Sequence, residues 1–181
     1  MRKFMLTALL AFGMVAGAQA EEALSLTPED TYKMVQEQGD DMLFIDVRDP
    51  VEIMFIGFTD AVDQNIPFQL VDRTRFNDEK QVFAMDLNEN FVAEVDAALE
   101  AKGLDRASLI VTMCRSGSAR GKPSADYLLG KGFTNVKYVD NGFQGSTAKE
   151  GEKKGMRVVN GWQNSGLPWA SKANPEKIYR P

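Results

Sequence analysis

The sequence predicts an α/β fold in which helices cover both faces of a central parallel sheet. Two observations support this prediction: short apolar strand candidates recur along the chain, and segments with helical patterns lie between them. Strands that alternate with helices form parallel sheets, and such sheets are buried on both faces. The length of 181 residues suits one domain with a sizeable core.

The first predicted helix and the first predicted strand lie before residue 50. Thr27 is suited to cap a helix, Pro28 to occupy its first position, and Gly39 to end it. The strand candidate is the apolar run MLFIDV at residues 42–47, which the turn residues 48–50 close.

The second half of the chain predicts two more helices and two more strands. Residues 91–102 carry apolar side chains at helical spacing and stop before a glycine, and residues 109–113 (LIVTM) form a buried-strand candidate. Residues 122–131 form the next predicted helix, because Pro123 suits its first turn, and residues 136–139 (VKYV) form the last strand.

Three other segments have no clear place in this pattern. Residues 68–90 are rich in charged and turn-forming residues, which indicates an insertion or a long loop. Residues 146–155 (STAKEGEKKG) are expected to form a solvated loop. Trp162 and Trp169 lie among turn residues in the tail, and we expect them to pack over the edge of the core.

The first twenty residues resemble a secretory signal peptide. Arg2 and Lys3 precede an apolar stretch at 4–17, and Ala-Gln-Ala at 18–20 supplies the small residues of a cleavage site. The stretch is too short for a spanning helix. We therefore expect residues 1–20 to be cleaved and residues 21–181 to form a single domain, periplasmic or secreted, with no membrane association after cleavage.

Composition excludes several classes of function. The formal net charge of −5 makes nucleic acid an unfavourable partner. The chain has no histidine and one cysteine, so it has no Ser-His-Asp triad, histidine metal site, internal disulfide or thiolate zinc cluster. We expect no cofactor and no metal.

The single cysteine, Cys114, lies in the segment MCRSGSARG at 113–121, between a strand end and a helix start. Sites in open α/β sheets form at such strand ends. Backbone N–H groups of the loop, a helix N-terminus, Arg115 and Arg120 would together bind an anion and favour the thiolate. We therefore predict a catalytic Cys114. The predicted substrate-binding residues are Arg115, Ser116, Gly117, Ser118, Ala119 and Arg120.

Several short motifs occur along the chain. In order they are Asp46-Val47-Arg48-Asp49-Pro50, Asn65-Ile66-Pro67, Cys114-Arg115-Ser116-Gly117, Asp140-Asn141-Gly142-Phe143, and Gly161-Trp162 with Gly166-Leu167-Pro168-Trp169. Together they resemble the motifs of a single-domain rhodanese, a sulfurtransferase. The resemblance implies a rhodanese-like α/β fold and a persulfide on Cys114. Sulfur would come from thiosulfate or a persulfide donor and pass to cyanide, a thiol or a partner protein. The resemblance also implies a supporting ion pair of Asp46 and Arg48.

Two departures from the family pattern leave alternatives open. Residues 146–159 form an apparent insertion, for which the family is no guide. The loop reads Cys-x5-Arg, one residue longer than the common Cys-x4-Arg, and resembles that of cysteine phosphatases and arsenate reductases. If the extra residue instead starts the helix early, the pocket stays narrow. The third alternative is a rhodanese-like binding module without turnover.

Overall fold

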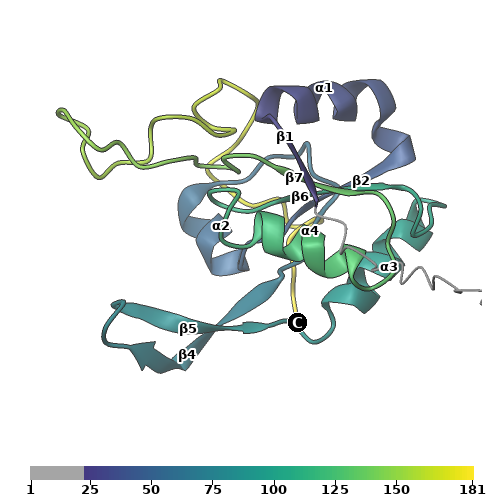
Figure 1. Ribbon diagram of the computed structural model, residues 1–181, viewed down its shortest axis with the longest axis horizontal. Helices are drawn as coiled ribbons and strands as arrows, with labels where there is room; N and C mark the ends of the chain where they lie inside the picture. The colour runs from purple at the N-terminus through teal and green to yellow at the C-terminus, as the bar shows by residue number, and fades with distance from the viewer. Residues whose placement is uncertain (1–22) are drawn as a thin grey trace, which may run out of the picture.

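The computed structural model describes residues 23–181 (Figure 1). The predicted signal peptide at 1–20 lies outside the described residues. In chain order the elements are β1 (Leu24–Leu26), α1 (Pro28–Gln38), a 3-10 turn (Gly39–Asp41), β2 (Met42–Asp46), α2 (Pro50–Ile56), β3 (Gln64–Asn65), β4 (Gln69–Asn77), β5 (Val82–Leu87), α3 (Phe91–Ala101), β6 (Leu109–Met113), α4 (Gly121–Leu129) and β7 (Val136–Val139).

The central sheet has the strand order β1-β7-β6-β2-β3 and is parallel throughout, as predicted. In its centre β2 pairs with β6, so that Met42 lies opposite Leu109 and Asp46 lies opposite Met113. The two strands therefore end side by side, and the loops that follow them begin at the same edge of the sheet.

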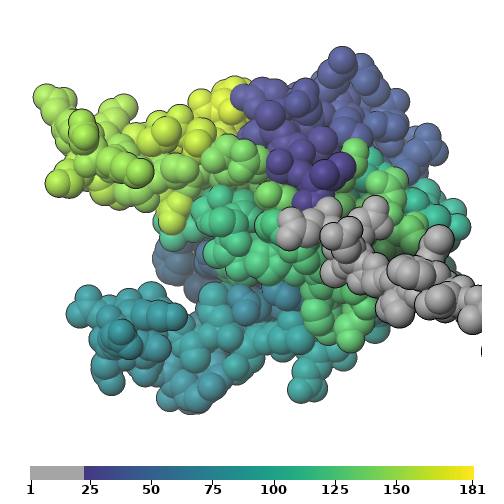
Figure 2. Space-filling view, viewed as in Figure 1, coloured from purple at the N-terminus to yellow at the C-terminus, as the bar shows by residue number. Residues whose placement is uncertain are grey.

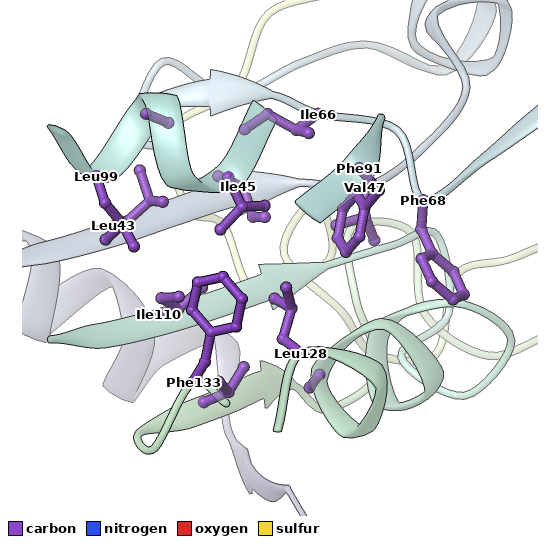
Figure 3. Close-up of a cluster of buried hydrophobic side chains, with 14 of the residues drawn as sticks. Leu43, Ile45, Val47, Ile66, Phe68, Phe91, Leu99, Ile110, Leu128 and Phe133 are labelled. Carbon is purple, nitrogen blue, oxygen red and sulfur yellow. The ribbon is translucent and has the colours of Figure 1, made fainter. Parts of the chain in front are cut away.

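Alternate residues of β2 point to opposite faces of the sheet. Leu43 and Ile45 pack with buried side chains of α3 and α4 on one face (Figure 3). Met42 and Phe44 pack on the other face, with side chains of α1, α2 and Trp162. All five residues of the strand are buried. The prediction of helices on both faces is thus confirmed.

Two helices start with the same capping chemistry, although only one of them was predicted. The Thr27 side chain accepts a hydrogen bond from the Asp30 N–H at 3.0 Å and begins α1. The Asp49 carboxylate accepts from the Val51 N–H at 2.8 Å, and Pro50 begins α2. The sequence prediction assigned residues 48–50 to a turn that closes the strand; they also begin a seven-residue helix, which is too short to show a helical period.

For residues 68–90 the sequence indicated an insertion or a long loop, and the alternative of a long loop was wrong. Most of this segment is an antiparallel hairpin of β4 and β5, which projects from the body at the lower left of Figure 1. Its side chains are largely exposed on both faces, so the alternation of apolar and polar residues that marks a half-buried strand is missing. Contacts across the strands hold it instead: Phe76 packs edge-on against Phe83 at 5.3 Å, and Arg75 pairs with Asp86.

The tail and the second predicted loop agree with expectation. Trp162 is fully buried in the core and donates from its indole Nε1 to the Pro168 carbonyl at 2.9 Å. Trp169 is 46% exposed and packs edge-on against Phe143. Residues 146–155 form an exposed loop without helix. Within residues 23–181, none of the helices is long and apolar enough to span a bilayer.

Candidate active site

The candidate site lies where β2 and β6 end beside each other. Cys114 follows β6 directly, and the last residue of that strand, Met113, is the register partner of Asp46. The Val47 N–H donates to the Met113 carbonyl at 2.9 Å and continues the pairing past the strand ends. This register brings the loop that contains Cys114 next to the segment that contains Asp46 and Arg48, at the edge where sites form in open α/β sheets.

Cys114 is a buried free cysteine, and the chain after β7 fixes the start of its loop. The Phe143 N–H donates to the Cys114 carbonyl at 2.8 Å, and the Gln144 N–H donates to the Arg115 carbonyl at 2.9 Å. Gly142 lies directly against this part of the loop, with φ of +57°, and a Cβ there would stand 2.3 Å from the Cys114 carbonyl oxygen. Only glycine permits this approach.

The loop offers a series of backbone donors. The N–H groups of the six residues from Arg115 to Arg120 make no hydrogen bond with any residue in the described part of the chain. Gly117 adopts φ of +80°, which directs the chain around a tight curve. Helix α4 starts directly after the loop, and its N-terminus adds partial positive charge. Such a set of N–H groups is suited to bind an anion.

The loop contains seven residues before the helix, Cys114 to Arg120. Arg120 occupies the N-cap position of α4, and the helix begins at Gly121. The Lys122 N–H donates back to the Gly117 carbonyl at 2.9 Å, so the helix connects tightly to the second half of the loop. The helix thus begins one residue before the start at 122 that the sequence predicted.

Arg120 is buried and forms a two-pronged ion pair with Glu52 of α2. Its Nη2 donates to Glu52 Oε1 at 2.8 Å, and its Nη1 donates to Oε2. Burial alone would lower the pKa of Arg120, but the hydrogen bond and charge of Glu52 outweigh it, so the pKa lies above its usual value; the charge of Cys114 acts in the same direction. Burial would raise the pKa of Glu52, and Arg120 holds it below the usual value.

Arg48 and Asp46 form a fully buried ion pair below the loop. Arg48 Nε donates to both carboxylate oxygens of Asp46, at 2.9 and 3.0 Å, and its Nη2 donates to the Gly57 carbonyl at 3.0 Å. The guanidinium carbon stands 4.1 Å from the ring centre of Phe143. Arg48 thereby supports the segment that holds the Cys114 carbonyl.

Arg115 extends toward the chain that follows β7. Its Nε donates to Gln144 Oε1 at 2.8 Å. Burial lowers its pKa below the usual value, and the positive charge of Arg157 adds to this effect. Ser116 is half-buried, and Ser118 and Ala119 are exposed. All the loop residues predicted from the sequence thus lie together beside Cys114, whereas Asp46 and Arg48 lie beneath them.

Sequence reasoning missed three residues of this arrangement: Glu52, Gln144 and Arg157. A Pro after an Asp at 49–50 indicates a helix start, and recognition of that helix would have placed Glu52 in its first turn. The other two residues come from a distant part of the chain, and no sequence pattern near them indicates their contact with the loop.

No group of three or more Cys, Asp or Glu side chains within residues 23–181 is arranged to hold a metal ion.

Comparison with protein families gives a match consistent with this geometry. The model of the rhodanese-like domain matches residues 27–149. The chain belongs to the rhodanese-like family. The match of the rhodanese model ends inside the segment 146–159, which the sequence identified as an apparent insertion.

Solved and curated relatives are distant from this rhodanese-like chain. The crystal structure of Rv0390 from M. tuberculosis is 25% identical, with a TM-score of 0.61, and the match covers 83% of this chain and 99% of the other. The polysulfide-sulfur transferase of Wolinella succinogenes is 24% identical with a TM-score of 0.45, over 82% of this chain and 78% of the other. The tRNA uridine(34) hydroxylase of Corynebacterium efficiens is 23% identical over 87% of this chain, which spans 43% of that relative's length.

Proposed function

We propose that this protein is a sulfurtransferase that carries sulfur as a persulfide on Cys114. The observation that carries the proposal is the loop that follows the cysteine at the N-terminus of α4, whose six N–H groups have no partner among residues 23–181. These donors suit the negative charge of a thiolate, a persulfide or a thiosulfate. Membership of the rhodanese-like family supports the same chemistry.

In the first step the Cys114 thiolate attacks the outer sulfur of thiosulfate. A bond forms between the cysteine sulfur and that outer sulfur, and the S–S bond of thiosulfate breaks. Its electron pair leaves with sulfite, so the step needs no further oxidant or reductant. The N–H groups of the loop stabilise the negative charge on the transferred sulfur.

In the second step an acceptor removes the outer sulfur. Cyanide or a thiolate attacks that sulfur, the persulfide bond breaks, and Cys114 leaves as the thiolate with the electron pair. Thiocyanate or a new persulfide is the product. Asp46 and Arg48 make no contact that places them against the reacting atoms, and their role is to support the loop.

The proposal is tested by mass spectrometry after thiosulfate treatment. We expect one added sulfur, about 32 Da, on the peptide that contains Cys114, and its loss on addition of cyanide. Cys114→Ser should show neither the mass increase nor thiocyanate production. Turnover retained by Cys114→Ser would overturn the assignment.

A second candidate is phosphate-ester or arsenate chemistry, which the seven-residue loop favours because a wider ring of donors fits a tetrahedral oxyanion. The ion pair at Arg120 argues against it. Both terminal nitrogens of Arg120 bind Glu52, whereas a bound oxyanion would need a guanidinium directed at its own oxygens. Direct competition decides between the two: thiosulfate with cyanide against an aryl phosphate, with Cys114→Ser as the blank. Phosphate release well above the blank, without thiocyanate, would favour the phosphatase.

We also propose that the protein acts outside the cytoplasm, in the periplasm or after secretion. The basic start, the apolar stretch and the small residues before Glu21 support this proposal. The intact mass of the protein isolated from its native cells should correspond to a chain that begins at Glu21. A mass that includes residues 1–20 would contradict export by cleavage.

A further inference from the structure

An open cavity of about 620 Å³ lies beside the catalytic loop. Ser116 and Ser118 of that loop form one wall, only two and four positions after Cys114. The other walls come from the inserted segment, residues 146–159, which Figure 2 shows as the yellow-green projection at the upper left. The insertion therefore builds a concave surface next to the sulfur carrier.

The cavity is lined by positive charge. Lys149, Lys154 and Arg157 line it, and no carboxylate of the described residues does. Neither lysine forms an ion pair with any residue between 23 and 181. Arg157 Nη1 donates to the Gly145 carbonyl, and its charge acts on Arg115 in the loop. None of these three cations forms an ion pair with a carboxylate of the described residues, so an anion would relieve their mutual repulsion.

Hydrogen bonds hold the inserted segment in a defined shape. The Ala148 N–H donates to the Met156 carbonyl at 2.9 Å, and the Gly155 N–H donates to the Ala148 carbonyl at 2.9 Å. At the base, the Asn160 side chain accepts from the Ser146 N–H at 2.7 Å. Because these bonds close the segment on itself, the backbone that carries the cations is shaped before any ligand binds, which lowers the entropic cost of binding.

We propose that this cavity binds the carboxylates of a small dicarboxylate thiol that accepts sulfur from Cys114, an inference that rests on the proposed sulfurtransferase function. Because Ser116 and Ser118 belong to both the loop and the cavity wall, an acceptor bound in the cavity lies next to the loop that carries Cys114. The volume suits a small molecule and not a protein surface. The acceptor thiolate attacks the outer sulfur of the persulfide, a new S–S bond forms, and Cys114 leaves as the thiolate.

The test compares two acceptors with two double variants. Mercaptosuccinate supplies a thiol with two carboxylates, 2-mercaptoethanol supplies a neutral thiol, and thiosulfate is the donor throughout. Lys149→Gln with Lys154→Gln removes two charges that line the cavity. Lys153→Gln with Lys172→Gln removes two exposed charges that do not line it, and serves as the matched control.

For the cavity variant we expect kcat/KM for mercaptosuccinate to fall about tenfold, as expected for lost charge-assisted contacts, with no change for 2-mercaptoethanol. The control variant should match wild type with both acceptors.

An equal loss of kcat/KM in both variants would show that the effect comes from the overall charge of the protein, and would overturn the inference. A wild-type enzyme that does not prefer mercaptosuccinate would overturn it as well, and would favour a protein acceptor. Absence of a Cys114 persulfide after thiosulfate treatment would instead reject the proposed function itself, and the inference with it.

Discussion

At the scale of single residues, the structure of the loop around Cys114 depends on the buried charge of Arg120 and on the absence of a Cβ at Gly142. Arg120 supplies the charge: it is buried at the N-cap of α4, and its electrostatic interaction with Cys114 is among the effects that raise its own pKa. Because Gly142 has no Cβ, the chain after β7 can pack directly against the loop.

Gly142→Ala should destabilise the protein far more than replacement of another glycine that also has a positive φ. A Cβ at Gly142 would stand within 2.8 Å of three backbone atoms of the loop, whereas one at Gly103, with φ of +70°, meets nothing within 4 Å. We expect a loss of about 3 kcal/mol for Gly142→Ala and about 1 kcal/mol for Gly103→Ala. Urea unfolding measures both losses, and equal losses would contradict the close approach.

At the scale of elements, the ion pair of Glu52 and Arg120 joins the first turn of α2 to the start of α4. Loss of one partner from a fully buried pair costs about 3–5 kcal/mol. The Glu52 side chain is 21% exposed, so we expect Glu52→Gln to cost about 1–2 kcal/mol at pH 7.

The pH dependence of that loss follows from the lowered pKa of Glu52. A carboxylate whose pKa is lower in the folded state than its ordinary 4.5 stabilises the protein above pH 4.5, and the contribution disappears as the pH falls through the folded value. Urea unfolding at pH 7 and at pH 3 should therefore show a smaller difference between wild type and Glu52→Gln at pH 3. A difference that stays constant would contradict the ion pair.

At the scale of the whole molecule, residues 146–159 form a wall beside the Cys114 loop and do not contribute to the central sheet. The bonds between Ala148 and the pair Gly155-Met156 close residues 149–154 into a loop. Replacement of 149–154 by Asn-Gly, a pair that suits a two-residue hairpin turn, should leave the fold intact.

This shortened variant should also keep its turnover of thiosulfate with cyanide, because both molecules are small enough to react within the Cys114 loop. Transfer to mercaptosuccinate should fall, because the replacement removes Lys149 and Lys154. Steady-state rates of thiocyanate formation provide the measurement. If they collapse while the melting temperature is unchanged, the insertion belongs to the catalytic site itself.

The sequence by itself determined the parallel α/β sheet and the position of Cys114 at the end of a strand. Apolar runs such as residues 109–113 and caps such as Thr27 are local features, and their physical consequences are local as well. A buried strand is apolar on both faces wherever it occurs, so its pattern can be read without knowledge of its neighbours. The hairpin at 68–90 was missed for the same reason, because exposure on both faces leaves no such pattern.

Only the tertiary structure decided which side chains act on the loop. Glu52 lies 68 positions from Arg120, and Gln144 lies 29 positions from Arg115. Contacts of this kind depend on the register of β2 with β6 and on the path of the chain after β7, and no local pattern records either of them. Sequence periodicity reports which face of an element is buried; the partner that buries it is set by how the elements pack.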